Sequence, residues 1–74
     1  MIELDVRVIP PPQKHATIHE KLDQLAPGEA LRITNDHDPR PLRYELEHDH
    51  PGSFAFDYVE SGPEKWLVDI VKTK

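Results

Sequence analysis

Histidines, carboxylates and an amide gather at two places in this 74-residue sequence, and these are the side chains best suited to chemistry. One is the run Asn35-Asp36-His37-Asp38, which is followed by Pro39 and Arg40. The other is His15, near the start of an expected helix. Imidazole and carboxylate groups together suit zinc, iron or nickel. They also suit proton transfer between an acid and a base.

Hydrophobic periodicity predicts the elements that must position these residues. Apolar and charged residues alternate in the strands, and Ile18, Leu22 and Leu25 recur at helical spacing. Prolines and glycines separate the segments. In chain order we expect a strand over Ile2–Val8, a helix from about Pro12 to Leu25, a strand over Ala30–Thr34, a helix from Pro39 to about Asp49, and strands over Phe54–Tyr58 and Trp66–Ile70.

This order, β-α-β-α-β-β, predicts an α/β two-layer sandwich with two helices on one face of a four-stranded sheet. The strand-helix-strand unit at the start favours a right-handed crossover between parallel strands. The length allows a single domain over residues 1–74, with a thin core. The expected core residues are Leu4, Val6, Ile18, Leu22, Leu31, Ile33, Leu42, Leu46, Phe56 and Val68.

Composition excludes several classes of function. Nine Lys and Arg residues stand against 14 Asp and Glu residues, a net charge of −5, and the basic residues are scattered. Nucleic-acid and membrane-surface binding both need basic clusters, so neither is expected. The absence of cysteine rules out thiol catalysis and thiolate metal sites. It also fits a reducing compartment, and we expect a cytoplasmic protein.

The predicted topology brings the two polar places together. Parallel neighbouring strands end at the same edge of a sheet, where ligands of open α/β sheets usually bind. Two helix N-termini at that edge also favour an anion. The candidate ligand-binding residues are therefore His15, Asn35, Asp36, His37, Asp38 and Arg40, with His15 and His37 as candidate metal ligands.

A purely structural interpretation of the same residues stays open. Asp38 precedes Pro39 and is a candidate N-cap of the second helix, with the proline at the first helical position. Asn35 and Asp36 can hold the loop by bonding its backbone. His15 continues the helical spacing of Ile18 and is then a packed histidine.

His15 and His19 lie one helical turn apart, a spacing that can chelate a metal ion. No glutamate lies between them, so this is not the metalloprotease motif. With His15 at the edge of the core, we expect His19 to point partly outward. Two histidines alone rarely make a strong site.

The linear pattern of the chain resembles the domain of unknown function 2249 family over nearly its whole length. The most specific parts are the Asn-Asp-His-Asp-Pro string and the Gly-Pro-x-x-Trp hairpin. The matching residues are Leu4-Asp5-Val6-Arg7, Pro10-Pro11-Pro12, His15, Leu22-Asp23, Gly28-Glu29, Asn35-Asp36-His37-Asp38-Pro39, Pro41-Leu42, Pro51-Gly52, Glu60, Gly62-Pro63 and Trp66.

That family has no settled activity, and its members occur alone, in tandem or fused to hemerythrin-like domains. It in turn resembles the TusA/SirA-like sulfur carriers, which implies a mixed sheet with one antiparallel strand. Those carriers place a Cys-Pro step at the entrance of the first helix, where this chain has Pro11-Pro12. Sulfur relay therefore does not carry over, but the helix entrance remains an expected working surface.

Together these observations predict a small intracellular binding or interaction module, and the resemblance implies a hemerythrin-like or other protein as its partner. No activated nucleophile or cofactor motif is present, so a binding module is favoured over an enzyme. One alternative is a metal- or haem-binding domain that uses His15 and His37. Another is an acid/base enzyme that uses His37 with Asp36 or Asp38. The cofactor and the oligomeric state stay unassigned.

Overall fold

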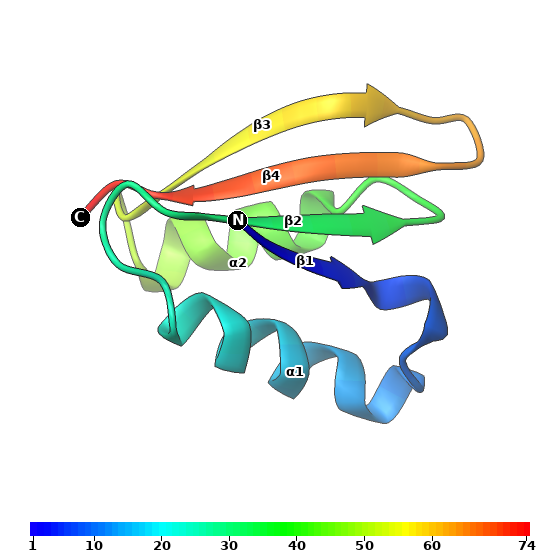
Figure 1. Cartoon of the computed structure of the whole chain (residues 1–74), viewed down its shortest axis with the longest axis horizontal. Coiled ribbons are helices and arrows are strands. Elements are labelled where there is room, and N and C mark those ends of the chain that lie inside the picture. Colours follow the sequence, from blue (N-terminus) through cyan, green and yellow to red (C-terminus); the bar gives the residue numbers. More distant parts are fainter.

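A computed structural model describes all of residues 1–74 and contains the expected order of elements (Figure 1). A short 3₁₀ turn, η1, follows the first strand. The elements are β1 (Ile2–Asp5), η1 (Val6–Val8), α1 (Pro11–Asp23), β2 (Ala30–Asn35), α2 (Arg40–Asp49), β3 (Phe54–Ser61) and β4 (Trp66–Lys72).

The four strands form one mixed sheet in the order β1-β2-β4-β3. β1 and β2 are parallel neighbours, with Leu4 opposite Ile33. β4 runs antiparallel to both β2 and β3, so it is the one strand of opposite direction. The predicted parallel start and the predicted antiparallel strand are both confirmed.

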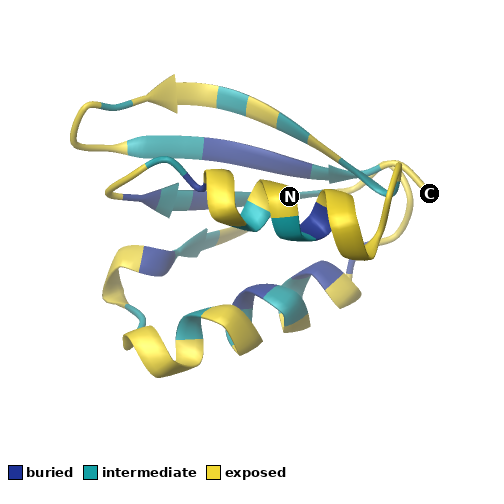
Figure 2. Cartoon of the chain, turned by 180° about the vertical axis from the view of Figure 1, so that it is seen from behind, coloured by how far each residue is buried: buried dark blue, intermediate teal, exposed yellow.

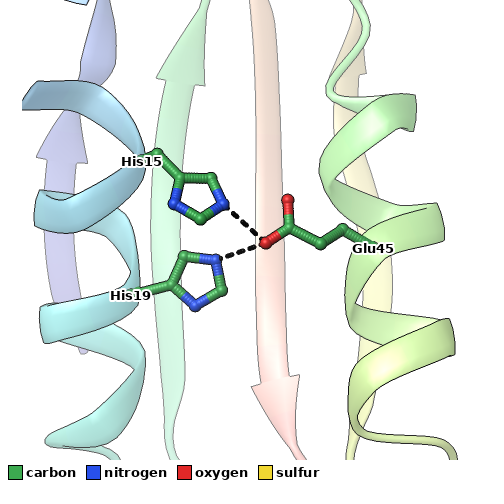
Figure 3. Close-up of side chains that lie close together, drawn as sticks. All are labelled: His15, His19 and Glu45. Carbon is green, nitrogen blue, oxygen red and sulfur yellow. Dashed lines mark hydrogen bonds and ion pairs between the residues drawn. The ribbon is translucent and has the colours of Figure 1, made fainter. Parts of the chain in front are cut away.

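Both helices cover the same face of the sheet and lie beside each other, as Figure 3 shows from the helix side. Their buried residues point toward the sheet, while their outer faces are exposed (Figure 2). The core lies between these two layers. It consists of Val6, Ile18, Leu22, Leu25, Leu31, Ile33, Leu46, Val68 and Ile70.

The predicted core is confirmed at its centre and differs at its margins. Leu4, Leu42 and Phe56 are only partly buried, and they pack against the central cluster. Leu25 and Ile70 belong to that cluster although they were not in the predicted set. Alternation along β4 gives Ile70 the same phase as Val68, because residues two apart share a face of a strand.

The first strand is shorter than expected and ends at Asp5 rather than Val8. The Asp5 carboxylate accepts a hydrogen bond from the Arg7 amide at 3.0 Å and thereby caps the 3₁₀ turn. The Arg7 guanidinium also bonds this carboxylate and lowers the pKa of Asp5 to about 2. The turn ends the alternation, so Val8 is exposed while Val6 stays buried.

The face of the sheet without helices carries charged side chains. Glu3, Arg32, Asp69 and Asp57 stand opposite one another across the four strands. Arg32 binds Asp69 through two parallel N–H···O bonds of 2.7 and 2.9 Å, which satisfies a carboxylate that is itself buried. None of the helices is both long and apolar enough to span a bilayer.

Leu22 tests the packing of α1 on the sheet, since its side chain is 2% exposed. Leu22→Ala should lower the free energy of unfolding by about 2–5 kcal/mol, because it removes a buried side chain and leaves a cavity. Glu20→Ala on the exposed side of the same helix should change it by less than about 0.5 kcal/mol. Urea unfolding measures both, and equal losses would contradict this orientation of α1.

Candidate metal centre and adjoining pocket

A pocket of about 230 Å³ opens between the N-terminal halves of α1 and α2, beside the C-terminal end of β2. It has an apolar part, formed by Val6, Ile18, Ile33 and Leu42 together with two prolines. Its polar side chains are Lys14, His15, Asn35, His37 and Glu45. The pocket therefore lies at the sheet edge where the sequence places the candidate site.

Two histidines of α1 point at one glutamate of α2 across the gap between the helices (Figure 3). Glu45 Oε1 accepts a hydrogen bond from His15 Nε2 at 2.6 Å and another from His19 Nε2 at 2.8 Å. The two imidazole rings lie 4.3 Å apart between centroids, with planes tilted by 38°. Two imidazole nitrogens thus meet at one carboxylate oxygen.

The α-helix explains why the two imidazoles meet. Residues four apart lie on the same side of a helix, one turn above the other, so His15 and His19 project in the same direction. The two histidines differ in exposure to solvent. The His15 side chain is 68% exposed, whereas the His19 and Glu45 side chains are 27% and 31% exposed. The expectation that His15 lies at the edge of the core is wrong, because His15 is the more exposed of the pair and His19, although partly exposed, is the inner one.

His37 reaches the same pocket from the loop after β2. Its Nδ1 donates to Asp36 Oδ1 at 2.6 Å, and this hydrogen bond holds the pKa of Asp36 below its ordinary value. Its Nε2 makes no hydrogen bond within the chain, and 65% of its side chain is exposed. The imidazole ring of His37 is therefore positioned through Nδ1, and its Nε2 is free to bond water or a ligand.

The six candidate ligand-binding residues separate into two groups. His15, Asn35 and His37 line the pocket, whereas Asp36, Asp38 and Arg40 do not. The three-ligand cluster contains His15 but not His37, which stays a candidate only through the pocket. Asp38 makes no hydrogen bond to His37 and bonds Tyr58 and Arg40 instead.

Asp38 is not the N-cap of α2, and that prediction is wrong. The helix begins at Arg40 after Pro39, with no side-chain hydrogen bond at the cap. Asp38 Oδ1 instead accepts a hydrogen bond of 2.8 Å from the hydroxyl of Tyr58 in β3. A partly buried tyrosine hydroxyl needs a partner, and local sequence gives no sign of a contact between residues 20 apart.

Glu45 is the functional residue that sequence reasoning missed. It lies three residues after Leu42 and next to Leu46, so it falls on the inward stripe of α2. A carboxylate in an otherwise apolar stripe is the signal that was available. Its partners on another helix were not visible from spacing along the chain.

Comparison with known proteins identifies the family of this chain. The model of a family described as "Uncharacterized conserved protein (DUF2249)" matches residues 3–72. The chain belongs to the DUF2249 family. No curated protein and no solved structure matches the sequence. The resemblance to this family is therefore confirmed, and the match reaches every element of this DUF2249 domain, leaving out only Ile2 of β1. The likeness to the TusA-type carriers stays a prediction.

The bond between Tyr58 and Asp38 predicts a loss of stability at alkaline pH. Burial, followed by the hydrogen bond to Asp38, raises the pKa of Tyr58 above its ordinary value of 10.0. The neutral phenol is thus favoured in the folded state. Its contribution is complete below pH 10 and is lost as the pH rises toward the folded-state pKa.

Tyr58→Phe should remove this part of the alkaline dependence, because phenylalanine does not ionise. The measurement is the free energy of unfolding in urea at several pH values from neutral to alkaline. Tyr44→Phe, at a tyrosine that is 59% exposed, is the matched control and should follow the wild-type curve. Parallel curves for wild type and Tyr58→Phe would contradict the assigned contact.

Proposed function

We propose that this DUF2249 domain is a cytoplasmic binding module that holds one divalent transition-metal ion between α1 and α2. Its protein ligands are His15, His19 and Glu45. The single observation that supports this is the convergence of two imidazole Nε2 atoms on one carboxylate oxygen. All three ligand atoms lie within 4.8 Å of one another.

The donor set selects the kind of ion. Two imidazoles and a carboxylate are ligands of zinc and of non-haem iron, whereas magnesium and calcium favour oxygen ligands alone. Three protein ligands also leave coordination positions for water or a small ligand. Since His15 and Glu45 also line the pocket, those positions would face it.

The arrangement limits the reorganisation that binding needs. The two imidazoles come from one rigid turn of α1, and Glu45 already holds both Nε2–H groups in place. An imidazole coordinates through Nε2 only when it is neutral and carries its proton on Nδ1, so protons compete with the ion and affinity should weaken as the pH falls. The carboxylate is only partly exposed, and the ion's charge would balance its own.

The binding prediction uses untagged protein treated with a chelator and then titrated with Zn²⁺ by isothermal calorimetry. The wild type should bind one equivalent. Glu45→Gln and His19→Ala should each weaken binding by at least about tenfold, because each removes a ligand. Chemical shifts of the His15 and His19 ring protons should move in the same titration.

Glu47→Gln is the matched control for this experiment. Glu47 lies two residues after Glu45 on α2 and pairs with Arg43 on the exposed side of the helix. The Glu47→Gln substitution should leave the affinity for zinc unchanged. Equal affinity in wild type and Glu45→Gln, or binding reduced only by changes at His48 or His50, would overturn the proposed site.

The hemerythrin-like partner and the His37 acid/base alternative stay predictions. For the second, the structure offers the hydrogen-bonded pair of His37 and Asp36 beside the pocket. Asp38 takes no part in that pair, because its oxygens are engaged by Tyr58 and Arg40. The metal site is favoured because three groups converge there rather than two.

A further inference from the structure

Asn35 is a polar residue at a position that alternation along β2 assigns to the core. Leu31, Ile33 and Asn35 share the face of β2 that the helices cover, and all three are buried. Asn35 is the last residue of the strand and is only 8% exposed. A buried amide costs free energy unless its polar atoms have partners, so an asparagine here needs an explanation.

Of the two polar atoms of the Asn35 side chain, only one has a hydrogen-bond partner within the chain. Asn35 Oδ1 accepts a hydrogen bond from the Asp36 amide at 2.9 Å, whereas Nδ2 donates none. No fully buried polar side-chain atom of the protein lacks a partner, so Nδ2 must reach an accessible space. The accessible space that Asn35 lines is the pocket. A ligand in the pocket is therefore a partner that the free N–H groups of Asn35 could bond.

Lys14 gives the same pocket a positive charge. It lines the pocket from the first turn of α1 and forms no ion pair with any carboxylate. Its charge reaches the neighbouring loop, where it helps to lower the pKa of Asp36. Arg7 and Arg40, two other cations at this edge, are engaged by Asp5 and Asp38 and lie outside the pocket. The cation available to a ligand is thus Lys14.

From these observations we propose that the pocket binds a small organic carboxylate. Asn35 Nδ2 and Lys14 Nζ donate to the carboxylate group, and the apolar body of the ligand packs on Ile18, Ile33 and Leu42. The volume of about 230 Å³ is below the usual range for drug-sized ligands, which limits the body to a few carbon atoms or one ring.

The charges around the pocket favour this class over its competitors. Beside Asn35 and Lys14, away from Glu45, a cation would meet only donors without acceptor capacity at those atoms. A dianion such as phosphate would meet one lysine and the carboxylate of Glu45. A monocarboxylate carries only one charge against Glu45, pairs with Lys14 and the Asn35 amide, and uses the apolar surface that inorganic anions leave uncovered.

Benzoate is the test ligand and benzamide its neutral isostere. Chelator-treated protein is titrated with each while backbone and Asn35 side-chain amide signals are followed by NMR. Benzoate should cause saturable shifts at Asn35, His37 and Leu42, with benzamide at least about tenfold weaker, because a charged acceptor strengthens both hydrogen bonds. Inorganic phosphate should produce no saturable shift at Asn35.

Variants separate the pocket from the rest of the surface. Lys14→Met keeps most of the side chain's length but removes its charge, and it should weaken benzoate binding by about tenfold. Lys21→Met, on the same helix but outside the pocket, is the matched control and should bind as the wild type does. Asn35→Asp should abolish binding, and Lys14→Met keeps the test valid if that variant fails to fold.

The proposal does not depend on the metal site, and one variant distinguishes the two. Glu45→Gln should lose zinc affinity and bind benzoate more tightly, because it removes a negative charge from the pocket wall. Equal shifts with benzoate and benzamide, or benzoate binding unaffected by Lys14→Met, would overturn the carboxylate site whatever the zinc titration shows.

Discussion

The parallel pairing of β1 with β2 is the constraint on which the rest of this structure depends. Because the two strands run in the same direction, the chain must cross back between them, and α1 makes that crossing. The chain segments that leave both strands consequently start at the same edge of the sheet. Residues that lie 22 apart along the chain, His15 and His37, therefore line one pocket.

A second consequence follows from placing both helices on one face. α1 and α2 each turn apolar residues toward the sheet, and the core fills the space beneath them. Between the two helices the side chains include polar ones. There Glu45 of α2 bonds His15 and His19 of α1. The Glu45 carboxylate is only partly exposed to water, so the two imidazoles, or an ion, stabilise its charge there.

The proposed metal centre and the proposed carboxylate pocket share His15 and Glu45. Any effect of the ion on the affinity of the pocket must equal the effect of the pocket's ligand on the affinity for the ion. An ion at Glu45 would neutralise the negative wall of the pocket, which favours an anion beside Lys14. The two sites are thus expected to bind cooperatively, and a small domain without a thiol gains a way to hold an anionic ligand.

The sequence by itself determined the order of elements, the faces of the strands, most of the core and the edge where the site lies. Periodicity carries that information because it is local. The tertiary structure decided what depends on contacts between distant residues: Glu45 meets His15 and His19, Tyr58 bonds Asp38 outside the helix cap, and Asn35 lines the pocket while its Nδ2 has no partner within the chain. Only packing brings such side chains together, so spacing along the chain could not reveal which of the candidate histidines share a ligand.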